Sequence, residues 1–226
     1  MNFMDNAPRS RMRIRFARLA PAGNMSHLEQ IRVFRDIAAA SGLDCWPAKL
    51  GSGLVPKMAF GPALPTGCES LCEYADLYLA QSCKEETAMA RLSSAVDGRF
   101  ALLSVKRVPV YFPSIESSVN AVRYLVEADL NDLSRERVDA FLARESAPYT
   151  KPAAEGAGET IDARPLILGA ELISAGSVRL VLKFEPGKNI KPADAAGVIT
   201  GRAVEPVRTV REELYWRDSA GRLEII

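Results

Sequence analysis

The run MSHLEQIRVFR, residues 25–35, begins the stretch around which the fold is organised, and PKMAFGPALP, residues 56–65, ends it. Ser26 and Glu29 have the spacing of a capping box, in which each side chain accepts a hydrogen bond from the other residue's amide. The pattern therefore predicts a helix from Ser26 to Ser41. Side chains at helical spacing form the face expected to be buried, which comprises His27, Ile31, Phe34 and Ala38 and is flanked by Leu28 and Ile37.

His27, the single histidine of the chain, lies in the first turn of this helix. One interpretation is a neutral, hydrogen-bonded histidine beneath a sheet, since partial burial is ordinary for histidine. The other is a site residue, because a helix N-terminus offers free amides and a positive potential to an anion. Ser26 and Glu29 would then belong to the same anion site. His27 alone does not make a zinc site, and we predict no metal ligand here.

The composition is that of an ordinary soluble globular protein, with 226 residues, 48% hydrophobic and 25% charged. A net charge of +1 gives no global attraction to nucleic acid or membrane, so such binding would need a local basic patch. No run approaches the ~20 apolar residues of a membrane span. The first six residues lack a signal-peptide core, so we expect a cytoplasmic protein that does not bind membranes.

Four cysteines, at positions 45, 68, 72 and 83, fit free thiols in a reducing compartment. The spacing of Cys68 and Cys72 is wider than that of a zinc knuckle or a redox motif. A metal or cluster site built from Cys68, Cys72 and Cys83 is the alternative. We predict no cofactor.

An arginine row follows the expected mobile tail of residues 1–10. Strict alternation over residues 11–18 predicts a half-buried strand with Met12, Ile14 and Phe16 toward the core. Arg11, Arg13 and Arg15 then share the opposite face, where like charges repel one another. Either acidic residues of a neighbouring strand, such as Glu73 and Asp76, neutralise them, or they contact phosphate on an exposed sheet face.

The remaining patterns predict two similar halves. In the first half we expect strands at 11–18, 57–60, 72–83 and 100–108, and helices at 26–41 and 84–96. In the second half we expect strands at 119–129, 178–184, 207–216 and 222–226, an extended segment at 160–173 that Pro165 interrupts, and helices at 134–144 and 191–199. Residues 47–56 are expected to be turns, residues 61–67 an ordered apolar loop, and residues 151–159 a break.

This order predicts an α+β protein with two tandem ferredoxin-like βαββαβ domains, each with an antiparallel sheet. The first domain would span residues 1–112 and the second residues 113–226. The bare sheet faces would be the binding surfaces, as in RNA-binding domains of this shape. The loop from Phe60 to Leu64 would either dock another protein or complete the core.

Three segments together resemble the radical SAM-linked protein family: RIRF (13–16), SHLE (26–29) and PKMAFGPALPTGCES (56–70). The family comprises small bacterial proteins, or C-terminal domains, found beside or fused to a radical SAM enzyme, and its function is unassigned. The resemblance implies a radical SAM partner and a role in RNA modification or processing. The chain lacks the CxxxCxxC motif, so it would not itself hold the radical SAM cluster.

The chain departs from the family pattern at one informative place. The family has a GFNPHPK segment before the proline loop, and here Gly51, Pro56 and Lys57 fit while Val55 replaces the histidine. If that histidine pairs with the SHL histidine in relatives, this chain has lost half of the pair. Any metal or acid–base role of His27 would then be lost with it.

We therefore expect an accessory protein of a radical SAM enzyme that presents RNA, with Arg11, Arg13 and Arg15 as phosphate contacts. An RNA-cleaving or RNA-modifying enzyme is the first alternative, with His27 as general acid or base and Lys57 as electrophile. A protein-docking scaffold without a ligand is the second.

Overall fold

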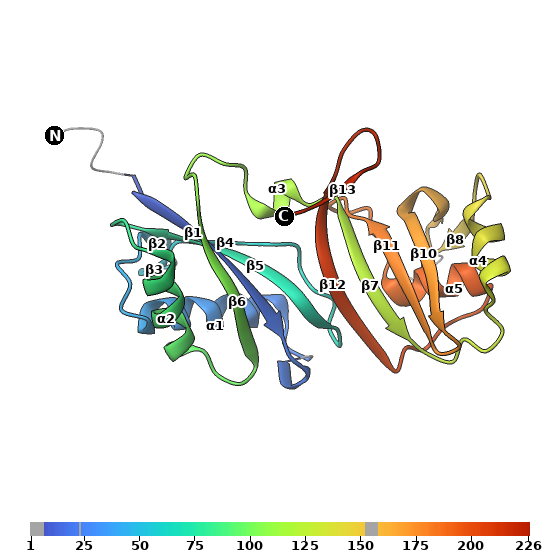
Figure 1. The fold of residues 1–226 in the computed structure, drawn as a ribbon, viewed down its shortest axis with the longest axis horizontal. Helices are drawn as coiled ribbons and strands as arrows, with labels where there is room; N and C mark the ends of the chain where they lie inside the picture. The colour runs from blue at the N-terminus through green and yellow to red at the C-terminus, as the bar shows by residue number, and fades with distance from the viewer. Residues whose placement is uncertain (1–6, 23, 152–157) are drawn as a thin grey trace. The chain divides into compact units, whose positions relative to one another are not determined.

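The computed structural model describes residues 7–22, 24–151 and 158–226. It divides the chain into two compact units, Met1–Ser118 and Val119–Ile226 (Figure 1). The described part is a mixed α+β protein with antiparallel sheets, as predicted from the sequence. The predicted domain boundary, between residues 112 and 113, lies just before helix α3 (Ile115–Ser118), the last element of unit 1.

The described part of unit 1 contains a sheet, a separate hairpin, three α-helices and one short 3-10 helix. In chain order its elements are β1 (Ser10–Arg18), η2 (Ala20–Ala22), α1 (His27–Ala40), β2 (Pro47–Leu50), β3 (Gly53–Pro56), β4 (Met58–Phe60), β5 (Glu69–Leu79), α2 (Glu85–Ala95), β6 (Phe100–Val108) and α3.

The sheet of unit 1 has the strand order β4-β5-β1-β6, and every neighbouring pair is antiparallel. One face carries the core, in which Met12, Ile14 and Phe16 of β1 pack with Phe34 of α1 and Leu92 of α2. The predicted core face of β1 is therefore confirmed. Because successive strand residues point to opposite faces, the arginine row lies on the second face.

Helix α1 begins as its sequence predicts. Ser26 accepts a hydrogen bond from the Glu29 amide at 3.2 Å, and the Glu29 carboxylate accepts one from the Ser26 amide at 2.7 Å. Gly42 follows the helix with φ +67°, a backbone conformation that suits glycine. The predicted inner face is wrong at Leu28, whose side chain is 67% exposed. The polar Gln30 is buried instead and accepts a hydrogen bond from Arg18.

Residues 47–56 are a β-hairpin rather than the predicted turns. Strands β2 and β3 pair from Pro47–Pro56 to Leu50–Gly53, so Gly51 and Ser52 form the two-residue connection. The positive φ of Gly51, +59°, matches the mirror-image turns that join such strands. Each strand has only four residues, which is too short for the alternation test to detect.

Unit 2 repeats the combination of a sheet, a separate hairpin and helices. In chain order its elements are β7 (Ala121–Glu127), α4 (Arg135–Leu142), β8 (Pro148–Thr150), β9 (Thr160–Asp162), η3 (Arg164–Leu166), β10 (Ile167–Ser174), β11 (Ser177–Lys183), α5 (Pro192–Thr200), β12 (Arg208–Arg217) and β13 (Leu223–Ile225).

Its sheet has the order β10-β11-β7-β12-β13, again antiparallel throughout. Helix α4 packs against β10 and α5 (Figure 1), and α5 packs against β7 and β11. The predicted interruption of the extended segment 160–173 at Pro165 is confirmed: η3 separates β9 from β10 there, because proline does not fit the interior of a strand. Strand β8, which pairs with β9, was not predicted.

Two predictions fall wholly or partly outside the described residues. The mobile tail 1–10 includes positions 1–6, and β1 already begins at Ser10. The break at 151–159 includes positions 152–157. Across the described ranges, no helix combines the length and the apolar character needed to cross a bilayer.

Candidate functional site

The second face of the unit 1 sheet brings the arginine row together with two residues of β5. Arg11 lies opposite Tyr78 and Arg13 lies opposite Asp76 in the register of β1 with β5. Arg11 Nε donates to Asp76 Oδ2 at 2.8 Å, and Arg13 Nε donates to Asp76 Oδ1 at 3.0 Å. An acidic neighbour for the row is thus confirmed at Asp76, which serves two arginines at once.

Arg11 is not the exposed phosphate contact that the alternation suggested. Its side chain is 1% exposed and that of Asp76 is 0% exposed. Its second nitrogen, Nη2, also contacts Asp76, and the guanidinium donates to the carbonyl oxygens of Phe112 at 2.6 Å and Pro113 at 2.8 Å. All three nitrogens of this guanidinium therefore have hydrogen-bond partners within the protein, as burial of a charge requires.

Lys57 joins Arg11 at the ring of Tyr78. The Lys57 ammonium lies 4.8 Å from the ring centroid, and the Arg11 guanidinium lies 5.6 Å from it, both within the range of cation–π attraction. We call Arg11, Arg13, Lys57, Asp76 and Tyr78 the cation cluster. Two of its positive groups, Arg11 and Arg13, bind the single carboxylate, and the third, Lys57, lies at the Tyr78 ring. With three positive groups and one carboxylate, the formal charge of the cluster is positive.

Arg15, the third member of the row, continues along the same face. Its guanidinium lies 5.8 Å from the ring centroid of Tyr74, its cross-strand partner on β5. Arg15 and Arg13 are both half-buried, unlike Arg11.

Ser26, His27 and Glu29 lie at the start of α1, away from the cation cluster. The capping box occupies Ser26 and Glu29 with each other, and the Ser26 hydrogen bonds hold the pKa of Glu29 below its usual value. An added anion would compete with this carboxylate for the helix N-terminus. Two polar groups of the predicted anion site, Ser26 and Glu29, are therefore paired with each other.

His27 is half-buried and packs its ring edge-to-face against Phe60, with the centroids 6.4 Å apart. Phe60 contacts the helix-covered core, whereas Lys57 lies on the second face of the sheet with Tyr78. The sheet therefore separates His27 from Lys57. The structure does not bring together the acid–base and electrophile pair that an RNA-cleaving site would need.

Of the four cysteines, Cys68 and Cys72 are buried, and Cys45 and Cys83 are partly buried. In the described ranges, no group of three or more His, Cys, Asp or Glu side chains is arranged to hold a metal ion. Burial, and to a smaller extent Asp44, raises the pKa of Cys45 to about 11.

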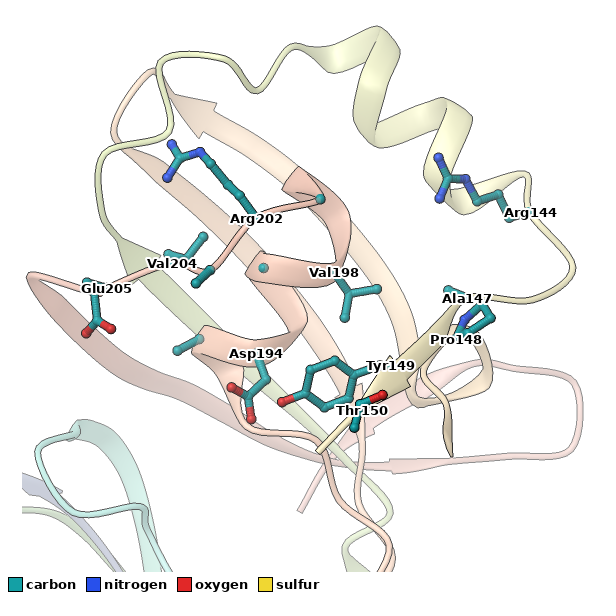
Figure 2. A pocket seen from close by; sticks show the side chains of 14 residues that line it. Arg144, Ala147, Pro148, Tyr149, Thr150, Asp194, Val198, Arg202, Val204 and Glu205 are labelled. Atoms are coloured by element: carbon teal, nitrogen blue, oxygen red, sulfur yellow. The ribbon is translucent and has the colours of Figure 1, made fainter. Parts of the chain in front are cut away.

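Unit 2 contains a pocket of about 660 Å³ that the sequence did not predict. It lies between α5 and strand β8, with Asp194 and Val198 on the helix and Tyr149 and Thr150 on the strand (Figure 2). The Tyr149 hydroxyl points toward the Asp194 carboxylate (Figure 2). Burial first, and Asp194 second, raise the pKa of Tyr149 to about 12.

None of the predicted site residues lines this pocket. The signal for it was weak, because β8 has three residues and stands before a Pro/Gly/Ala-rich segment. Tyr78 was also missed as a site residue, since its place between Arg11 and Lys57 follows from strand register and not from local spacing.

The chain belongs to DUF2344, a family of uncharacterized proteins conserved in bacteria, and its match to that family extends over residues 11–192. The match runs from β1 to the first residue of α5. The predicted membership of a bacterial family of unassigned function is confirmed.

No functionally curated protein matches the sequence. Among solved structures, a chain of a Cbf5-Nop10-Gar1 complex is similar, with a TM-score of 0.47 and 7% identity. The similarity covers 92% of this chain and 50% of that one, so the chain spans about half the length of that relative.

Proposed function

We propose that this protein is an RNA-binding accessory protein that works with a radical SAM enzyme. The observation that carries the RNA part is the cation cluster, in which three positive groups and a single carboxylate share one sheet face. RNA is a polyanion, and neutralising its phosphates releases bound counterions, which favours binding. The partner class rests on the sequence resemblance around SHLE and PKMAFGPALP.

Within the cluster the roles differ. Buried Arg11 contributes positive potential and holds neighbouring groups in place. Arg13 and Lys57 are half-buried and are the groups we assign to phosphate contact, together with Arg15. Because the net charge of the protein is only +1, attraction of RNA must come from this local patch and not from the protein as a whole.

The two units share one order of strands and helices. In each unit the sheet contains four strands that follow one order: β4-β5-β1-β6 in unit 1 and β10-β11-β7-β12 in unit 2. In both units a strand and helix precede a pair of strands, a second helix and a last strand that lies beside the first. We therefore propose that the units are tandem ferredoxin-like domains with an inserted hairpin each.

Fluorescence anisotropy with a labelled 20-nucleotide single-stranded RNA, titrated over a range of NaCl concentrations, tests this proposal. We expect Arg13→Ala/Lys57→Ala to weaken binding and to reduce the salt slope by about 0.7 for each phosphate that is no longer neutralised. Lys188→Ala is the matched control, because Lys188 is an exposed lysine of unit 2 paired with Glu185. If the double variant and the wild type have the same RNA affinity and the same salt slope, the cation cluster is not the RNA site.

The partner is tested by purifying the protein from its native cells at low salt and identifying what accompanies it by mass spectrometry. We expect a radical SAM protein together with nuclease-sensitive nucleic acid. A radical SAM protein without nucleic acid would favour the protein-docking scaffold instead. Exposed leucines on the β2–β3 hairpin and α1, namely Leu28, Leu50 and Leu54, would then be the first surface to examine.

A further inference from the structure

Two exposed aromatic rings follow β6 in a segment bounded by prolines, Pro109 to Pro113. Tyr111 is 86% exposed and Phe112 is 48% exposed. Their ring centroids are 5.6 Å apart and the planes are inclined at 76°, an edge-to-face pair. Neither ring is needed to fill a core, so their exposure points to a ligand rather than to packing.

The backbone that carries the rings is fixed. The Phe112 amide donates to the Pro109 carbonyl at 3.1 Å, which closes a turn, and Ile115 at the start of α3 is fully buried. Between these anchors, Arg11 donates to the carbonyls of Phe112 and Pro113. A backbone held this way loses little conformational freedom on binding.

Arg11 also connects the rings to the cation cluster. The guanidinium that holds the Phe112 carbonyl lies over the ring of Tyr78, which also packs against Lys57. An aromatic pair therefore adjoins a surface with an excess of positive charge. This combination is typical of proteins that bind single-stranded nucleic acid, in which bases stack on aromatic rings while cations meet the phosphates.

We propose that Tyr111 and Phe112 form a stacking platform for unpaired bases of the RNA bound by the cation cluster. This proposal rests on the proposed function and specifies the substrate as single-stranded RNA. Bases within a duplex are already stacked and paired, so a paired strand would reach the cations but not the rings.

The test uses the full chain and fluorescence anisotropy with two probes, a labelled 12-nucleotide oligouridylate and an RNA duplex of the same length. We expect Tyr111→Ala/Phe112→Ala to weaken oligouridylate binding by about 5- to 150-fold for each stacked base. Its salt slope should equal that of the wild type, because no phosphate contact is removed, and its duplex affinity should not change. Tyr111→Trp should retain oligouridylate binding, since it keeps a stacking surface.

Val207→Ala is the matched control, an apolar residue that is 86% exposed on unit 2. If the aromatic variant binds oligouridylate as tightly as the wild type, while Arg13→Ala/Lys57→Ala binds weakly, the stacking platform is refuted and the proposed function stands. If the wild type binds neither probe, both proposals are refuted. Matching circular dichroism spectra and unfolding midpoints for all variants establish that weaker binding does not come from unfolding.

Discussion

At the residue scale, Asp76 organises the second face of unit 1. Its carboxylate accepts from both Arg11 and Arg13, and Arg11 in turn holds the carbonyls of Phe112 and Pro113. A single buried carboxylate thus fixes the cation that positions the exposed aromatic pair. The sequence suggested three equal surface charges in the arginine row. In the structure Arg11 is buried and has a structural role, whereas Arg13 and Arg15 are more accessible.

Removal of this carboxylate should be strongly destabilising. Asp76→Ala leaves the buried Arg11 charge without its partner, and removing one member of a buried ion pair costs about 3–5 kcal/mol. Urea unfolding followed by circular dichroism measures the change in the free energy of unfolding. Arg13→Met is the comparison, because the Arg13 side chain is 15% exposed and Asp76 retains its ion pair with Arg11 in this variant. The decrease in stability should therefore be smaller than for Asp76→Ala. Equal stability of Asp76→Ala and wild type would contradict the assigned role.

At the element scale, α5 shows how local sequence sets the limits of a helix. Pro192 is its first residue, a position that tolerates proline because its amide would have no helical partner. Gly201 ends it with φ +71° and ψ +17°, the left-handed conformation. This ending turns the chain toward residues 202–205, which line the pocket of unit 2.

Gly201→Ala should reduce the free energy of unfolding by about 1 kcal/mol, because a Cβ is unfavourable in the left-handed conformation. Space is not the cause, since a Cβ at this position would meet only the end of the Arg137 side chain, at 3.7 Å. Gly98→Ala is the control: Gly98 has no positive φ and a Cβ there would meet nothing within 4 Å. Thermal and urea unfolding measure the change in the free energy of unfolding, which should differ in sign or size between the two variants. Equal decreases in stability would show that backbone conformation is not responsible.

At the scale of the whole molecule, exposed ion pairs in unit 2 make the stability of the fold depend on pH in the acidic range. Hydrogen bonds from Lys183 and Lys188 lower the pKa of Glu185 from 4.5 to about 2. Hydrogen bonds, chiefly from Arg202, lower the pKa of Asp132 from 3.8 to about 2. Carboxylates with a depressed pKa in the folded state stabilise it above their ordinary pKa and lose that contribution as pH falls.

We therefore expect the unfolding temperature to fall as pH decreases from about 4.5 toward 2. Asp132→Asn/Glu185→Gln should show a shallower decline over the same window, because two of the titrating groups are gone. Adding 1 M NaCl should reduce the difference between the variant and the wild type, since salt screens exposed pairs. Differential scanning calorimetry at several pH values measures the unfolding temperatures. If the unfolding temperatures of variant and wild type fall in parallel with pH at low salt, the two carboxylates do not cause the decline.

The sequence by itself determined the elements whose signals are local. Alternation over residues 11–18 identified β1 and its core face, and Ser26 with Glu29 identified the start of α1, because such patterns depend on neighbours a few residues apart. The α+β class followed from the same signals. The β2–β3 hairpin was missed, although its two-residue connection, Gly51 and Ser52, was a usable turn signal.

Only the tertiary structure decided which groups meet. Arg11 and Asp76 are 65 residues apart in sequence, and their contact depends on the register of β1 with β5. The same register places Tyr78 opposite Arg11, and the backbone pairing of Lys57 with Tyr78 brings the lysine to the same face. His27 lies on the other face, so the catalytic pair suggested by residue type alone does not form. Local periodicity fixes the face on which a side chain lies, whereas the partner it meets there is set by strand pairing over long range.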